Sequence, residues 1–356
     1  SSSVAVGHQA LNAQNFTSGT SAYNVAVGAN AGAAVTTGLQ NTLIGGLAGD
    51  ANTTGGDNIA VGYASLGANT ALGAYALDAN TTAGNNTAVG AGAVGSNTTG
   101  AGNTGIGRAA LVTNTTGADN VALGYRALNA NTTASNNTAV GKDALYANTT
   151  GTGNVAVGAT ALDANTTADG NTAVGSNALS ANTTGASNTG IGLGSLQLNT
   201  TGARNTALGN SSLDNNTEGN DNVGVGLNAL DDNTTGDSNT AVGRSSLANN
   251  TTADGNTAVG YYALEANTTG SDNTAFGKDA ASTLTTGSQN VIVGSSSSTV
   301  SVGSSNAQGF GYNLTCSDNY TTIGQGAADI RAEHGVATWA TVSDERYKKD
   351  IVDSTA

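Results

Sequence analysis

Apolar and polar positions alternate along this chain with a fixed period of 17 residues, seen plainly in NTAVGKDALYANTTGTG from Asn137 to Gly153. In each repeat a short aliphatic run ends in a glycine, here called the marker glycine, and an Asn-Thr-Thr segment follows. The marker glycine recurs without a slip from Gly73 to Gly294. No helix period fits this register, and such repeats are typical of a solenoid in which each repeat forms one coil.

We therefore predict an all-β protein, a parallel β-solenoid (β-roll) of about 19 coils, most of them one 17-residue repeat long. Each coil is expected to contain two short strands, NTAVG and roughly ALxAN, joined by turns. Residues 1–303 form the predicted repeat shaft and residues 304–342 a terminal cap region. Charged residues crowd together in residues 343–356, where we place a separate segment.

Two apolar columns are bulky enough to fill the coils: the residue before each marker glycine (the aliphatic column) and the residue four positions after it (the Leu column). We expect both inside. Because alternate strand residues point to opposite faces, the residue two before the glycine, mostly Ala or Gly (the small column), would point outward. A small apolar outer face is expected to be covered by sister chains, so we predict a homotrimer, intertwined or packed along this column. Its members include Ala88, Gly105, Ala122, Ala139, Ala156 and Ala173.

A polar column is equally regular: one Asn per repeat, such as Asn131 and Asn148, is followed by Thr. Stacked identical amides can form hydrogen bonds from coil to coil as an Asn ladder. The same segments match the N-glycosylation acceptor pattern. Side chains stacked about 4.8 Å apart leave no room for a glycan on each coil, so we favour the ladder.

Composition narrows the possible partners. The chain has a formal net charge of −14 and no basic stripe that could bind phosphates, so we expect no nucleic-acid partner. No apolar run reaches about 18 residues, so we expect no membrane insertion. Only His8, His334 and the single Cys316 could supply soft ligands, so we expect no metal site and no cofactor. The chain begins inside a repeat without Met, and we take it to be a fragment or mature piece of a longer protein.

The residues after the marker glycine vary from repeat to repeat, which makes this corner the candidate place for binding. Exposed Tyr can stack on sugar rings. The candidate receptor contacts are Tyr63, Tyr125, Arg126, Tyr261 and Tyr262. Random decoration of a repetitive surface is the simpler alternative. The carboxylates after the Leu column are expected to form a solvated face: Asp163, Asp214, Asp231 and Glu265.

The repeats resemble the head repeats of trimeric autotransporter adhesins, which form a left-handed parallel β-roll, and the NTAVG arrays of phage tail fibres. The segment SDERYKKDI, Ser343 to Ile351, resembles the start of the intramolecular chaperone auto-processing domain found at the ends of phage tail fibres, tail spikes and endosialidases. Together they imply the structural shaft or receptor-binding region of a trimeric tail fibre in the virion, involved in host attachment. Implied partners are other tail proteins and a host cell-surface glycan or protein receptor. The alternative is the head domain of a trimeric bacterial surface adhesin.

The second resemblance also implies self-cleavage. In that family the domain assists folding of the trimer and then cuts itself off at the serine that opens the motif. Ser343 would be the nucleophile, with Asp344, Glu345 and Lys348 as candidate helpers. The alternative is that Ser343 caps a helix beginning at Asp344. We expect no enzymatic activity on an external substrate.

Overall fold

The computed structural model describes residues 2–14, 21–50, 52–53, 56, 58–63, 69–80, 83–336 and 339–341, with side chains up to residue 336. It divides into two compact units, Ser1–Asn188 (unit 1) and Thr189–Ala356 (unit 2), which are described separately. The described residues contain strands and turns but no helix. The predicted all-β parallel solenoid with repeats of about 17 residues is confirmed.

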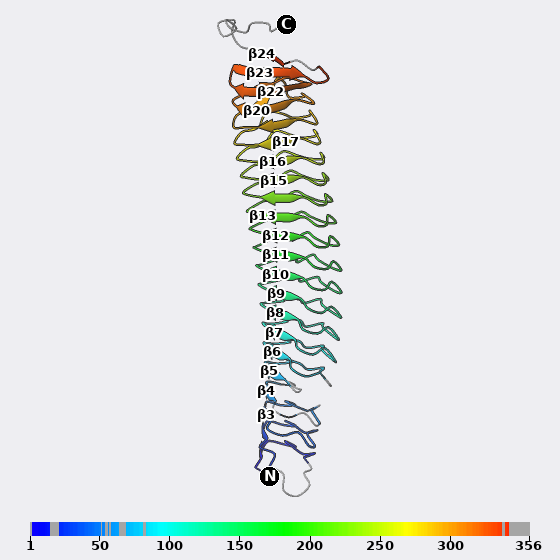
Figure 1. The fold of residues 1–356 in the computed structure, drawn as a ribbon. Helices are drawn as coiled ribbons and strands as arrows, with labels where there is room; N and C mark the ends of the chain where they lie inside the picture. The colour runs from blue at the N-terminus through cyan, green and yellow to red at the C-terminus, as the bar shows by residue number, and fades with distance from the viewer. Residues whose placement is uncertain are drawn as a thin grey trace, which may run out of the picture. The chain divides into compact units, whose positions relative to one another are not determined.

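In unit 1, each strand pairs in parallel with the next, one repeat further along the chain, as Ala139 does with Ala156 (Figure 1). The pairing continues through the shortened repeat, where Ile59 lies opposite Thr70. The strands are β1 (Val4–Val6), β2 (Val25–Val27), β3 (Thr42–Ile44), β4 (Ile59–Val61), β5 (Thr70–Leu72), β6 (Thr87–Val89), β7 (Thr104–Ile106), β8 (Val121–Leu123), β9 (Thr138–Val140), β10 (Val155–Val157) and β11 (Thr172–Val174).

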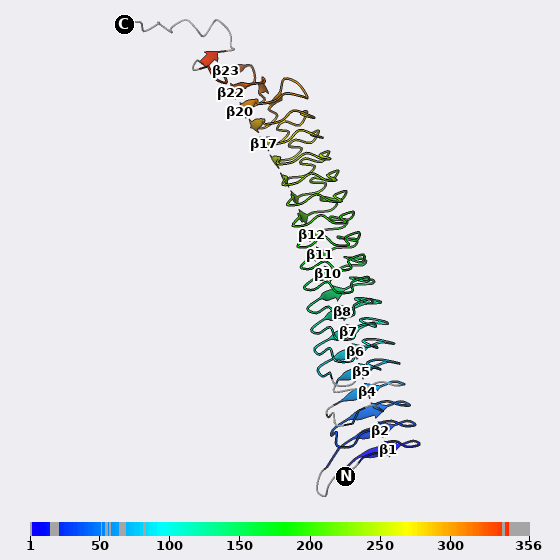
Figure 2. The same ribbon diagram turned by 90° about the vertical axis from the view of Figure 1, so that its right-hand side faces the viewer.

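Unit 2 continues the same pattern and then changes it near the C-terminal end (Figure 2). Strand β18 pairs in parallel with β20 and β20 with β22, whereas β22–β23 and β23–β24 are antiparallel. Strand β19 pairs with β21. The strands are β12 (Thr189–Ile191), β13 (Thr206–Leu208), β14 (Val223–Val225), β15 (Thr240–Val242), β16 (Thr257–Val259), β17 (Thr274–Phe276), β18 (Val291–Val293), β19 (Ser298–Thr299), β20 (Gln308–Tyr312), β21 (Thr315–Cys316), β22 (Tyr320–Gln325), β23 (Ala328–Glu333) and β24 (Trp339–Thr341).

The prediction that ALxAN forms a second strand in each coil is wrong. These residues form turns, and the backbone is left-handed at the Leu and at the residue just before the segment, as at Leu111 (φ 53°) and Ala109 (φ 57°). Left-handed residues cannot continue an extended strand. The turn is held instead by the amide of Ala110, which donates to the Gly107 carbonyl at 3.3 Å, and by coil-to-coil bonds such as Leu111 N to Ala127 O at 3.0 Å.

The predicted facing of the strands is also wrong. The small column, predicted to face sister chains, lies in the interior of the coil: Ala88, Gly105, Ala122, Ala139, Ala156 and Ala173 are all buried within the single chain. The Leu column is buried beside it, as predicted. Strand alternation then turns the aliphatic column outward.

The small column faces inward because the interior of the coil has little room beside the Leu column. A Cβ atom added to Gly105 would lie 2.6 Å from Cγ2 of Val94 in the preceding coil, so even a methyl group at this position would require Val94 to shift. Two coils reverse the two sizes: Leu43 and Ile292 stand in the small column, with Gly49 and Ser298 in the Leu column of the same coils. A Cβ atom at Gly49 would lie 2.7 Å from Leu43 Cδ1. Most coils therefore hold one large and one small side chain at these two positions. Ala26 with Gly32 and Ala275 with Ala281 are small at both.

The outer face of the strands is apolar and accessible. In the aliphatic column, Ile44, Leu72 and Leu123 are exposed in unit 1, and Leu208 and Phe276 are exposed in unit 2. Parallel sheets are normally covered on both faces. Nothing within either unit covers this one in the part of the chain that the structure describes, since these side chains remain accessible.

The predicted Asn ladder is confirmed, and a second one accompanies it. In the first, Asn131 Nδ2 donates to Asn114 Oδ1 at 2.8 Å and also to the Ala134 carbonyl at 3.0 Å. In the second, Asn137 N donates to Asn120 Oδ1 at 3.0 Å. All these Asn residues are buried. Buried amides are tolerated because their polar atoms bond to the neighbouring coil.

Candidate functional site

The corner after the marker glycine aligns one side chain per coil. In unit 1, Arg126 N donates to the Arg108 carbonyl at 3.1 Å, and Asp143 N donates to the Tyr125 carbonyl at 2.9 Å. These bonds hold successive coils in register at the corner. Arg108, Tyr125 and Lys142, each the first residue after a marker glycine, therefore lie on three successive coils. We call them the first Arg-Tyr-Lys ladder.

Side chains of this ladder contact one another directly. Arg108 Nη2 donates to the Tyr125 hydroxyl at 2.7 Å, and its Cζ lies 4.7 Å from the centre of the Tyr125 ring. The Arg126 Cζ lies 5.1 Å from the Tyr125 ring and 4.5 Å from that of Tyr146. Cations over aromatic faces at such distances are attracted by the ring quadrupole. The predicted contacts Tyr125 and Arg126 are thus brought together.

A carboxylate anchors the basic side chains. Asp143 Oδ1 accepts a hydrogen bond from Arg126 Nε at 2.7 Å, and Asp143 Oδ2 lies 3.5 Å from Lys142 Nζ. Burial raises the pKa of Asp143, but the hydrogen bond from Arg126 and the charges of Arg126 and Lys142 outweigh it and hold the pKa below its ordinary value. Asp143 is therefore ionised at neutral pH. Together with its neighbours Arg126 and Asp143, the first ladder groups three cations around one ionised carboxylate.

Unit 2 carries a second Arg-Tyr-Lys ladder, formed by Arg244, Tyr261 and Lys278. The Arg244 Cζ lies 5.9 Å from the Tyr261 ring. The rings of Tyr261 and Tyr262 are 4.0 Å apart and tilted by 52°. Lys278 Nζ lies 3.2 Å from Asp279 Oδ2. The predicted contacts Tyr261 and Tyr262 are thus neighbours as well.

Tyr63 belongs to a different pair. It is 52% exposed, and its ring lies edge-on to that of Tyr75, with centres 5.9 Å apart. Neither residue has a guanidinium over its ring among the described contacts. Sequence reasoning missed Tyr75, Asp143 and Tyr146 as neighbours of the candidate contacts. The interval of 17 residues between Arg126 and Asp143 was the signal that could have found that ion pair.

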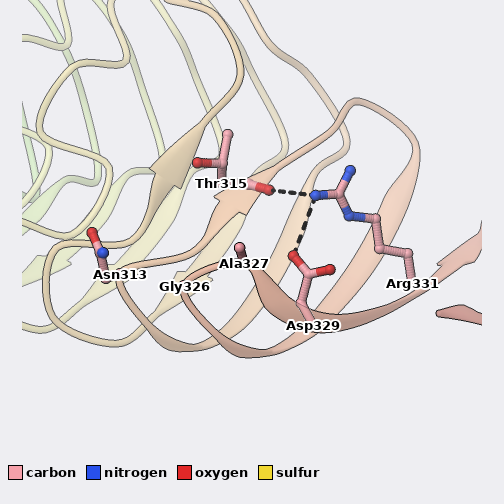
Figure 3. Close-up of a pocket in the computed structure, with 6 residues that line it drawn as sticks. All are labelled: Asn313, Thr315, Gly326, Ala327, Asp329 and Arg331. Carbon is pink, nitrogen blue, oxygen red and sulfur yellow. Dashed lines mark hydrogen bonds and ion pairs between the residues drawn. The ribbon is translucent and has the colours of Figure 1, made fainter. Parts of the chain in front are cut away.

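A hollow of about 390 Å³ lies among the C-terminal strands (Figure 3) and is lined by Asn313, Thr315, Gly326, Ala327, Asp329 and Arg331. Arg331 Nη2 lies 3.2 Å from Asp329 Oδ2 and donates to the Thr315 carbonyl at 3.4 Å. The Asp329 side chain is only 2% exposed. Its carboxylate is paired with the Arg331 guanidinium. The other lining residues are Asn, Thr, Gly and Ala, which supply no second titratable group that could act as an acid or base.

The residues of the predicted cleavage site, Ser343, Asp344, Glu345 and Lys348, lie outside the described residues. In the described part, no three His, Cys, Asp or Glu side chains come together in a way that could hold a metal ion. No helix there is long and apolar enough to cross a membrane. No protein-family model matches the chain, and no curated protein matches it in sequence.

Proposed function

We propose that this chain is the structural shaft of a trimeric phage tail fibre that takes part in host attachment. This proposal depends mainly on the exposed aliphatic column on the outer face of the strands in both units. A contiguous exposed apolar surface marks an interaction site. The homotrimer, first predicted through the small column, is therefore proposed through the aliphatic column.

Charge supports identical chains as the occupants of this face. The outward positions of the strands from β1 to β18 carry Val, Ile, Leu, Phe or Thr and no charged residue. The chain as a whole has a formal net charge of −14, so copies would repel one another through most other surfaces. Each copy also presents its aliphatic side chains at the same coil spacing, which lets columns from three chains match along their length.

Light scattering on the purified chain tests the trimer. A particle of three chains, each of 34.3 kDa, is expected. Replacing two exposed members of the column, Leu123→Lys with Ile106→Lys, should lower the mass, because charges would enter the proposed apolar contact. The matched control is Thr133→Lys at an exposed turn position. A monomeric wild-type chain, or a double variant that stays trimeric, contradicts the proposal.

The tail-fibre assignment is supported by the resemblance of SDERYKKDI to the start of the chaperone domain. The adhesin head shares the same proposed architecture, so the location of the protein separates the two. Mass spectrometry of purified virions should detect peptides of the repeat array. Recovery of the chain from a bacterial outer surface, and not from virions, would favour the adhesin.

A further inference from the structure

We propose that the two Arg-Tyr-Lys ladders are binding sites for an acidic sugar chain, such as a polyuronate. This inference deepens the proposed attachment role by naming a ligand class. It depends on three independent features of the ladders: the concentration of basic residues, the recurrence of the pattern, and the arrangement of cations around an aromatic ring.

Basic residues are concentrated in the ladders. Seven Lys and Arg residues occur between positions 1 and 341: Arg108, Arg126, Lys142, Arg204, Arg244, Lys278 and Arg331. Five of the seven belong to the ladders or contact them. Random decoration would spread them over the repeats. In a chain with a net charge of −14, these two corners hold most of the positive charge: Arg108, Arg126 and Lys142 surround Asp143 in the first, and Arg244 accompanies the Lys278–Asp279 pair in the second.

The pattern recurs as a set. From Arg108 to Arg244, from Tyr125 to Tyr261 and from Lys142 to Lys278 the interval is 136 residues, or eight repeats of 17. The acidic neighbour recurs as well, since Asp143 and Asp279 are separated by the same interval. Folding requires Leu and Asn at fixed positions of almost every repeat, so their recurrence carries no information about binding. The residues at the corner after the marker glycine are not restricted in this way and change from repeat to repeat. Recurrence of four variable positions in the same order points to a shared binding role.

The geometry suits a carboxylated sugar chain. Coils follow one another at about 4.8 Å, so each ladder presents a cation, an aromatic ring and a second cation in a row. No ion pair between described residues involves Arg108 or Arg244, which leaves their guanidinium groups without a carboxylate partner. Arg binds carboxylates through paired N–H donors. The Tyr125 ring, 4.7 Å from the Arg108 Cζ, and the Tyr261 ring, 5.9 Å from the Arg244 Cζ, support these guanidinium groups by cation–π contact.

Calorimetric titration with an oligogalacturonate tests the site, with an uncharged galactose oligomer of equal length as the control ligand. We expect binding of the acidic oligomer that weakens as salt is raised, and no comparable binding of the neutral one. Combined Arg108→Gln, Tyr125→Ala, Arg244→Gln and Tyr261→Ala substitutions should weaken binding by roughly tenfold or more. A variant altered in one ladder should keep about half of the sites.

The matched protein control is Arg204→Gln, since Arg204 is exposed and lies outside the ladders, paired with Asp221 at 2.6 Å. It should bind like the wild type. Thermal melting confirms that each variant is folded. Absence of binding, equal binding of the neutral oligomer, or equal loss in the Arg204→Gln variant overturns the proposal. Light scattering of the same samples separates the two proposals: a trimer that does not bind contradicts only the ladders, and a monomer that binds contradicts only the trimer.

Discussion

Leu43 and Gly49 share one volume in the interior of a single coil, because a Cβ atom on Gly49 would lie 2.7 Å from Leu43 Cδ1. Most other coils place the large residue in the Leu column and the small one in the strand, as with Leu145 and Ala139. The same interior is therefore filled in two ways. This relationship explains why the strands carry Ala, and it can be transferred to other coils.

Ala139→Leu alone should lower the free energy of unfolding by about 1–3 kcal/mol through overpacking, and Leu145→Gly alone by about 2–5 kcal/mol through a cavity. Gly32 in the preceding coil also lies against Leu43, since a Cβ atom there would lie 2.7 Å from Leu43 Cδ1. The triple variant Leu128→Gly, Ala139→Leu and Leu145→Gly therefore copies this arrangement, and Gly also suits the left-handed backbone at positions 128 (φ 51°) and 145 (φ 50°). We expect its loss to be smaller than the summed losses of the three single variants by at least about 1 kcal/mol in urea denaturation. Strictly additive losses would contradict the shared volume.

The Asn ladder should be a main source of stability in each coil. In Asn131→Ala, the side chain that bonds Asn114 at 2.8 Å and the Ala134 carbonyl at 3.0 Å is lost. Each buried polar group left without a partner costs about 1–3 kcal/mol. Urea denaturation should detect this loss, whereas the exposed control Thr133→Ala should change stability by less than about 0.5 kcal/mol. Equal effects of the two variants would argue against the ladder.

Asp231 makes the stability of the fold depend on pH, which the sequence did not predict. It was expected on a solvated face, but it is half-buried, and burial together with the charges of Asp214 and Asp232 raises its pKa to about 6. A folded-state pKa above the unfolded value, about 3.9, means that the group favours folding below the unfolded pKa. That contribution is lost as pH rises through about 6.

Asp231→Asn should therefore raise the melting temperature at pH 7, by roughly 2 °C after allowing for solvent screening of a half-exposed group. The gain should shrink as the pH is lowered from about 6 towards about 4. Glu218→Gln, at an exposed position of the same unit, is the control. A gain from Asp231→Asn that is independent of pH would rule out titration as its cause.

Cys316 should be chemically inert in the folded protein. It is fully buried, and burial raises its pKa to about 11. Because the thiolate is the reactive form, a disulfide reagent at pH 8 should modify native protein far more slowly than protein in urea. Thr133→Cys in a Cys316→Ser background supplies an exposed thiol for comparison. Rapid modification of native Cys316 would show that its environment is open.

Self-cleavage remains a prediction from the sequence. In a longer chain that includes the chaperone domain implied by SDERYKKDI, Ser343→Ala should abolish release of that domain, because the attacking hydroxyl is removed. Intact-mass spectrometry measures the outcome directly. Ser354→Ala is a control at another serine near the same end. Cleavage that persists in Ser343→Ala would leave helix capping as the better interpretation of this serine.

Much of the candidate site could be predicted from the sequence. The variable corner and the five candidate contacts were identified because these positions change while their surroundings repeat. The interactions among them were not, since the pairing of Arg126 with Asp143 and Tyr146 depends on how side chains extend across coils. The hollow beside Asp329 was also missed, because it arises from pairing between strands whose order does not follow the repeat.

The sequence by itself determined the period, the parallel stacking and the columns, since residues such as Asn131 and Asn148 recur at the interval that places them one coil apart. Only the tertiary structure decided which column faces inward. Strand alternation assigns neighbouring residues to opposite faces but does not say which face is the interior. That choice follows from left-handed turns such as the one at Leu111, which direct the Leu column into the coil, so that in most coils the residue beside it in the strand must be small.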